Sequence, residues 1–176
     1  MKITHRVERN GPVELYVPRE EWGPGPWQDE PDRIEWKTAA GLDALLHRSP
    51  LTGSFCGYVA VPPGHPLHGK HYRGEGSGLE AHGGITYSEG CSGDICHEPE
   101  PGEPDDVWWF GFDAGHAFDY MPAMEARTRK HMPPHLHSSG PFTGPAEEAE
   151  WHDVYRDLDY MRAQCEFLAA QLAAKR

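Results

Sequence analysis

Three side chains able to bind a metal ion follow the most aromatic segment of the chain at regular spacing. Asp113, His116 and Asp119 form the pattern Asp-x-x-His-x-x-Asp directly after Trp108–Phe112, a segment predicted to be a buried strand. A carboxylate at the end of a buried strand is costly unless it is hydrogen-bonded, paired or bound to a cation. Carboxylate and imidazole donors suit zinc, manganese and other divalent ions. The alternative is structural: Asp113 caps the following turn and His116 pairs with Asp119.

A second polar pair lies on a strand predicted over residues 79–87. Glu80 and His82 are two positions apart, so both would face the same side of a strand. A glutamate beside a histidine can serve as a general acid–base pair, and the next residues, Gly83 and Gly84, leave room for a ligand. We therefore predict that Glu80 is the general base for a metal-bound water and that His82 joins the metal ligands. The alternative is an exposed polar face.

Together these residues make one predicted site. The predicted ligands of a divalent ion, with zinc among the candidates, are His82, Asp113, His116 and Asp119. The predicted catalytic residues are Glu80, His82 and Asp113. His65 is predicted to contact the substrate, because the prolines around it would fix its position in a glycine-rich loop. The alternative is a solvated imidazole.

Cys91, Cys96 and His97 form a Cys-x4-Cys-His cluster. Structural zinc sites use such ligands but normally add a second pair nearby, which is missing here, so loop cysteines without a metal are the other interpretation. The N-terminal residues do not resemble a secretory signal, which predicts a cytoplasmic protein with all four cysteines reduced, Cys56 and Cys165 included. A disulfide between Cys91 and Cys96 is the alternative.

Composition limits the classes of function. The chain has 176 residues and a formal net charge of −12, which disfavours nucleic acids and anionic membranes as partners because both would be repelled. No apolar run approaches the roughly 20 residues that a membrane-spanning helix needs. The common phosphate-loop, dinucleotide-binding, serine-hydrolase and His-Glu-x-x-His patterns are also missing. The partner expected is therefore a small-molecule ligand.

Short strands, long loops and one long helix must position the site. Strands are predicted over residues 2–9, 13–17, 33–36, 55–61, 79–87 and 107–112, and residues 41–47 fit either a helix or a strand. Long loops are predicted over residues 62–78, 88–106 and 120–144. These elements predict an α+β fold in a single domain, residues 1–176. Its small, mostly antiparallel sheet with long loops (1–144) would pack against one long C-terminal helix (145–174).

Apolar residues spaced alternately by three and four positions mark the C-terminal helix. They are Trp151, Val154, Leu158, Met161, Cys165, Leu168 and Leu172. Thr143 is predicted to cap the N-terminus of this helix. One interpretation packs the apolar seam on the sheet of its own chain. The other joins two chains in a homodimer through the helix.

Four segments of the chain have a recognisable pattern. They are Gly57-Tyr-Val-Ala-Val-Pro-Pro-Gly-His-Pro66, Ala81-His-Gly-Gly-Ile-Thr86, Ile95-Cys-His97 and Asp105-Asp-Val-Trp-Trp-Phe-Gly-Phe-Asp-Ala-Gly-His116. With them, most of residues 55–120 and the helix at 155–172 resemble a family of small proteins from bacteriophages and actinobacteria. The resemblance implies a phage or bacterial cytoplasmic setting, but it carries no activity with it.

The chemistry of the predicted site therefore decides the functional hypothesis. The function that this chemistry favours is a divalent-metal-dependent hydrolase acting on a phosphoester or a nucleotide-like small molecule. The alternative is a non-catalytic phage or bacterial binding protein that sequesters a small molecule or blocks a host protein.

Overall fold

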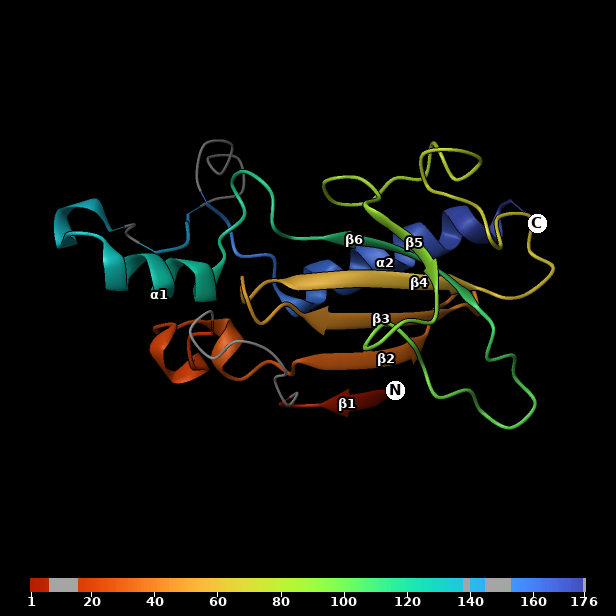
Figure 1. The fold of residues 1–176 in the computed structure, drawn as a ribbon, viewed down its shortest axis with the longest axis horizontal. Helices are drawn as coiled ribbons and strands as arrows, with labels where there is room; N and C mark the ends of the chain where they lie inside the picture. The colour runs from red at the N-terminus through yellow and green to blue at the C-terminus, as the bar shows by residue number, and fades with distance from the viewer. Residues whose placement is uncertain (7–15, 138–139, 145–152, 176) are drawn as a thin grey trace.

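A six-stranded antiparallel sheet forms the centre of the molecule (Figure 1). The structure is a computed structural model and describes residues 1–6, 16–137, 140–144 and 153–175. In sheet order the strands are β1 (Lys2–Thr4), β2 (Arg33–Lys37), β3 (Asp43–Arg48), β4 (Phe55–Val61), β6 (Trp108–Asp113) and β5 (Tyr87–Gly90). The helices are α1 (Pro122–His131) and α2 (Leu158–Ala173). The predicted α+β class is confirmed.

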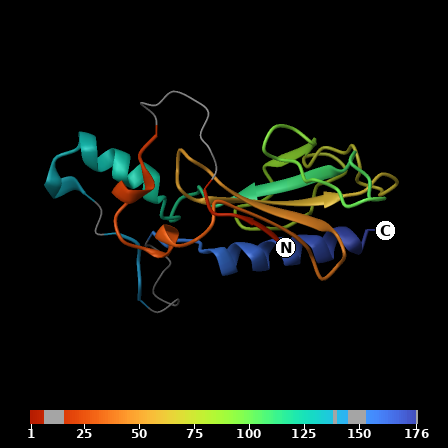
Figure 2. The ribbon, with the colours of Figure 1, turned by 90° about the horizontal axis from the view of Figure 1, so that it is seen from below.

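The two faces of the sheet have different covers (Figure 2). Successive residues of a strand point to opposite faces, and β3 shows the result. Leu46 joins the core under α2, whereas Leu45 joins a core on the far face with Trp109 of β6. Ile95, from the segment between β5 and β6, packs against that far core. The sequence of residues 41–47 fitted either a helix or a strand, and the structure shows that most of them belong to strand β3.

Strands β4 and β6 lie inside the sheet, as predicted for the aromatic segment. β6 pairs with β4 on one side and with β5 on the other. Gly57 of β4 lets the helix approach this pair closely. A Cβ at Gly57 would lie 2.6 Å from Cζ of Phe112 and 2.9 Å from Sγ of Cys165 on α2. The close contact between helix and sheet therefore requires glycine at this position.

Helix α2 packs on the sheet of its own chain. Four seam residues are fully buried: Met161, Cys165, Leu168 and Leu172. The predicted start at residue 145 and the Thr143 cap are wrong, because the helix begins at Leu158 and Asp157 caps it, accepting a hydrogen bond from the Tyr160 amide at 2.9 Å. Val154 instead forms a bridge with Asp119. Trp151 and most of the predicted first turns lie outside the described residues.

The strand predicted over residues 79–87 is wrong except at its end. Only Tyr87 belongs to β5. Gly83 and Gly84 have φ angles of +65° and +90°, a left-handed conformation that glycine adopts without strain and that interrupts a strand. Before them, the backbone of Glu80 bonds to the side chain of Gln171 on α2, with its amide 2.8 Å from Oε1 and its carbonyl 2.7 Å from Nε2.

Helix α1 lies within residues 120–144, which were predicted to be a loop. Pro122 suggested irregular structure, yet proline is well tolerated in the first turn of a helix, where its missing amide hydrogen costs nothing. At the other end of the chain, only Lys2–Thr4 of the strand predicted over 2–9 is observed, as β1, and residues 7–15 lie outside the described part. No helix within the described residues is both long and apolar enough to cross a membrane.

A buried ion network connects the start of α2 to the sheet. Nη2 of Arg48 on β3 lies 2.8 Å from Oε2 of Glu30, and its Nη1 lies 2.7 Å from the hydroxyl of Tyr155. The other oxygen of Glu30 accepts a hydrogen bond from the Leu158 amide at 2.9 Å. An acidic group at a helix N-terminus is favourable, because the free amides and the helix dipole attract it. The network fixes the end of α2 that carries part of the candidate site.

Candidate metal centre

Two histidines and one aspartate meet where β6 ends and α2 begins. The ligand atoms of His82, His116 and Asp119 all lie within 4.8 Å of one another. His82 comes from the turn before Gly83, and the other two come from the loop after β6. Three of the four predicted ligands are thus brought together by segments far apart in the sequence.

Asp119 is at the centre of this group. Its side chain is only 1% exposed. Oδ2 lies 2.7 Å from Nε2 of His82 and accepts a hydrogen bond from the His116 amide at 3.1 Å, while Oδ1 accepts one from Nε of Arg156 at 2.9 Å. Burial alone would raise the pKa of Asp119, but these donors together hold it below its ordinary value. The carboxylate is therefore ionised at neutral pH.

His82 is fixed by a hydrogen bond at each ring nitrogen. Nε2 faces Oδ2 of Asp119 at 2.7 Å, and Nδ1 faces the hydroxyl of Tyr160 at 3.0 Å. An ionised carboxylate can only accept, so Nε2 must carry the hydrogen. In the neutral ring Nδ1 then accepts from Tyr160. Helix α2 thus orients the imidazole through its first turn.

His116 has an unused ring nitrogen inside the group. Its Nδ1 is buried and has no hydrogen-bond partner among the described residues. It lies 3.6 Å from Oδ2 of Asp119 and 3.8 Å from Oδ1 of Asp113, both too long for a hydrogen bond. The ring packs against Gly83, where an added Cβ would lie 2.1 Å from Cε1. Gly83 therefore makes room for the His116 ring, whereas the sequence predicted room for a ligand at this position.

The loop that carries His116 and Asp119 is held in an unusual conformation. Phe118 has a φ of +70°, a left-handed conformation that costs a residue with a side chain roughly 1–3 kcal/mol. The segment before α2 stabilises it: the Val154 amide donates to the Phe118 carbonyl at 2.8 Å, and the Tyr120 amide donates to the Val154 carbonyl at 2.9 Å. The strained turn aims Asp119 inward.

Asp113 does not join the other three predicted ligands. The preceding residue, Phe112, faces the core under α2, so Asp113 points toward the opposite face. Its Oδ1 accepts from the Gly115 amide at 3.1 Å and its Oδ2 from the Thr86 hydroxyl at 3.2 Å. It remains the nearest further carboxylate to His116, at 3.8 Å.

Glu80 and His65 are placed differently from the prediction. The side chain of Glu80 is exposed, and the strand that would have aligned it with His82 is not present. His65 is buried, with Nδ1 accepting from the Leu67 amide at 3.1 Å and Nε2 facing the Leu172 carbonyl at 3.0 Å. Leu172 and Tyr160 are about 18 Å apart along α2 at 1.5 Å per residue. The roles of Glu80 and His65 therefore remain predictions without structural support.

A small cleft opens beside the group. It has a volume of about 210 Å³, and its walls include His116 and Asp119 with the apolar side chains of Phe118 and Met124. Phe118 and Met124 are both partly exposed. A small ligand in this cleft would contact an imidazole and a carboxylate at one end and apolar surface at the other.

Two residues of the site were not expected from the sequence. Arg156 and Tyr160 contact Asp119 and His82 from the far end of the chain. Their sequence signal is weak, because neither lies on the apolar seam of the helix and neither is near another candidate residue in the chain. Such partners, which orient the groups that touch a metal, can be found only once the fold is known.

Cys91, Cys96 and His97 form a second group on the far face of the sheet. Cys91 and Cys96 are joined by a disulfide, and Cys56 and Cys165 are free. The prediction of four reduced cysteines is therefore wrong for the first pair, and the alternative pairing is observed. The sulfur atoms of Cys91 and Cys96 and a ring nitrogen of His97 also lie within 4.8 Å of one another.

The first group has the donor set of a catalytic metal centre. Two imidazoles and one carboxylate are ligands that zinc, iron and manganese accept, and three protein ligands leave a coordination position open for water or substrate. Comparison of the chain with protein-family models, with curated proteins and with solved structures gives no match.

Proposed function

We propose that this protein binds a divalent metal ion through His82, His116 and Asp119 and uses it to hydrolyse a small phosphoester. One observation carries the proposal above the others. A buried, unpartnered imidazole nitrogen of His116 lies 3.6 Å from the ionised carboxylate of Asp119, whose same oxygen contacts His82, and the three residues each place a ligand atom within 4.8 Å of the others. A cation supplies the partner that the nitrogen lacks and balances the charge of the carboxylate.

Metal binding requires one proton to move. The hydrogen between Nε2 of His82 and Oδ2 of Asp119 has to leave, because a metal ion would bind a lone pair on each of these two atoms. Nδ1 of His82 then becomes the protonated nitrogen and donates to the hydroxyl of Tyr160, which now accepts. A tyrosine hydroxyl can play either role. Tyr160 therefore supports the imidazole in both states, and Arg156 continues to hold Asp119.

The open coordination position supports hydrolysis. A divalent ion such as zinc lowers the pKa of a bound water to about 7, which makes hydroxide available at neutral pH. Of the carboxylates expected to act at the site, Asp113 is better placed than Glu80 to accept the proton, because its Oδ1 lies 3.8 Å from the His116 ring. We therefore assign the general base to Asp113.

The size of the cleft favours a small substrate. Its volume of about 210 Å³ is below the 300–1,000 Å³ that is typical of sites for larger ligands. A compact phosphoester fits better than a whole nucleotide. The acidic chain would repel a free anion at long range, and Glu125 and Asp153 line the cleft, so the bound metal ion has to supply the local positive charge.

Hydrolysis of p-nitrophenyl phosphate with added zinc or manganese tests the proposal. Asp119→Asn and His116→Gln should each abolish metal-dependent turnover. Asp159→Asn, an equivalent change at an exposed position in the first turn of α2, should leave it intact. Comparing the circular dichroism of the variants would show whether the fold is retained.

Two results would contradict the proposal in different ways. Turnover unaffected by His116→Gln would show that the activity does not use this centre. Metal binding at full stoichiometry without turnover of any phosphoester would contradict the hydrolase and favour the non-catalytic binding protein.

A further inference from the structure

We propose that Cys91, Cys96 and His97 form a second metal site, which is closed by the disulfide in the oxidised protein and takes a zinc ion after the disulfide is reduced. This site is independent of the proposed hydrolytic centre. Two thiolates and an imidazole are strong zinc ligands, and the four residues between the cysteines fit the spacing of known zinc sites.

His97 gives the first evidence. Its side chain is only 7% exposed, and neither ring nitrogen has a hydrogen-bond partner among the described residues. The nearest carboxylate oxygen, Oδ2 of Asp43, is 3.8 Å from Nε2, which is too long for a hydrogen bond. The ring packs edge-on against Trp109 with centroids 5.7 Å apart. A buried imidazole without a partner is unfavourable, and a metal ion beside the two sulfur atoms would satisfy it.

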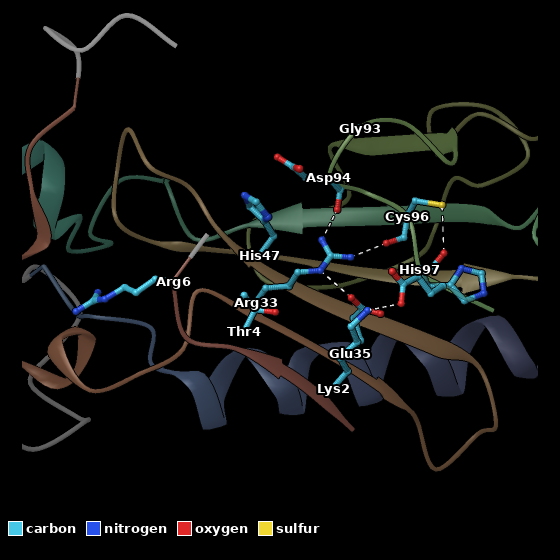
Figure 3. A pocket seen from close by; sticks show the side chains of 11 residues that line it. Lys2, Thr4, Arg6, Arg33, Glu35, His47, Gly93, Asp94, Cys96 and His97 are labelled. Carbon is cyan, nitrogen blue, oxygen red and sulfur yellow. Dashed lines mark hydrogen bonds and ion pairs between the residues drawn. The ribbon is translucent and has the colours of Figure 1, made fainter. Parts of the chain in front are cut away.

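The backbone that carries the ligands is held by contacts other than the disulfide. Cys91 directly follows β5, which is paired with β6. On the other side, the guanidinium group of Arg33 donates to the carbonyls of Asp94 and Cys96, as Figure 3 shows. Nε of Arg33 is bonded in turn to Glu35 at 2.7 Å. Breaking the disulfide would therefore leave both cysteines near their present positions.

A route to the site is also present. Cys96 and His97 line a cavity of about 410 Å³ between the loop and the strands β1 to β3 (Figure 3). Polar side chains such as Arg33 and Glu35 form much of its wall. A hydrated ion and a small reductant can therefore reach the sulfur atoms from solvent.

The redox step balances with a dithiol as the reductant. The dithiol supplies two electrons and two protons, the Cys91–Cys96 bond breaks to give two thiols, and the dithiol becomes a disulfide. Zinc then binds both sulfur atoms and the His97 nitrogen, and the two thiol protons leave to water. In a reducing compartment such as the cytoplasm, where the chain is expected to act, the loaded form would be favoured.

Cobalt binding to the full chain tests this inference. Cobalt(II) bound by thiolates has an intense charge-transfer band in the near ultraviolet, whereas cobalt at His82, His116 and Asp119 would lack it. Protein reduced with a phosphine, and then freed of it, should develop the band as cobalt is added, beyond any cobalt that the first site takes up. The oxidised protein should not. If the group of His82, His116 and Asp119 bound no metal, the thiolate band would still appear, so the two proposals are tested separately.

Matched variants make the test specific. Cys96→Ser should abolish the band and Cys56→Ser should retain it, because burial raises the pKa of the Cys56 thiol to about 12 and keeps it protonated. His97→Gln should weaken cobalt affinity by more than the roughly 10–100-fold that loss of a partner outside the coordination sphere costs. Absence of the band in reduced protein, its survival in Cys96→Ser or an unchanged affinity in His97→Gln would each overturn the inference.

Discussion

Nε2 of His82 and Oδ2 of Asp119 lie 2.7 Å apart, although the residues are separated by 37 positions in the chain. The contact joins the turn before β5 to the loop after β6, and Tyr160 and Arg156 attach it to the last part of the chain. Three segments therefore have to be in place before the candidate metal centre exists. The contribution of each segment to the candidate metal centre can be tested separately.

Gly83 should be required for the position of His116. A Cβ at Gly83 would lie 2.1 Å from the ring, whereas a Cβ at Gly84 would meet nothing within 4 Å. Both glycines have positive φ, so Gly83→Ala and Gly84→Ala share the backbone cost, of roughly 1–2 kcal/mol. Chemical unfolding should show a larger loss for Gly83→Ala, and calorimetry should show weaker metal binding in this variant alone. Equal effects in the two variants would argue against the close approach.

Asp119 should make stability depend on pH in the acid range. Folding lowers the pKa of Asp119, because its hydrogen bonds outweigh the effect of burial, so the folded state holds that proton less tightly than the unfolded state. The resulting stabilisation is complete above the ordinary value of 3.8 and is lost as the pH falls through the lower folded value. Urea unfolding on both sides of pH 3.8 should show this loss in the native chain and a smaller one in Asp119→Asn. Parallel pH profiles would contradict it.

Thiol titration should count two cysteines in protein that has been air-oxidised, kept free of reductant and then denatured. Cys91 and Cys96 are bonded, so the reactive thiols are Cys56 and Cys165. After reduction the count should rise to four. A count of four in the air-oxidised protein would contradict the Cys91–Cys96 bond.

Helix α2 offers neighbouring positions that test its packing. Leu168 is fully buried and Phe167 is 47% exposed. Leu168→Asp places a charge in the core and should lower the free energy of unfolding by several kcal/mol, whereas Phe167→Asp should change it by less than about 1 kcal/mol. Sedimentation of both variants would separate this from dimerisation. A folded Leu168→Asp monomer from a dimeric parent would show that the seam joins two chains.

Local pattern was enough to predict much of the sheet and part of the site. Alternation and aromatic content located β2, β4 and β6, and the spacing after β6 selected His116 and Asp119. Asp113 lies outside the group that the other three predicted ligands form, because side chains alternate along a strand and the residue after Phe112 faces away from α2. Glycine content could not distinguish a strand from the turn at Gly83.

The remaining errors come from contacts between distant segments. The spacing of apolar residues assigned Val154 to the helix. Val154 instead pairs with Asp119, and α2 begins only at Leu158. The roles of Tyr160 and Arg156 depend on the same arrangement. The spacing of apolar residues describes one helix face and carries no information about such pairings, so the supporting residues of the site could not be predicted.

Metal content tests the central claim most directly. The full chain, purified without an affinity tag and kept oxidised so that Cys91 and Cys96 stay bonded, should bind one equivalent of zinc or manganese by elemental analysis after dialysis. His116→Gln should lose that equivalent, and His135→Gln, a change at an exposed histidine, should keep it. An oxidised native chain without metal, or a His116→Gln variant that retains it, would contradict the assignment of His82, His116 and Asp119 as a metal centre.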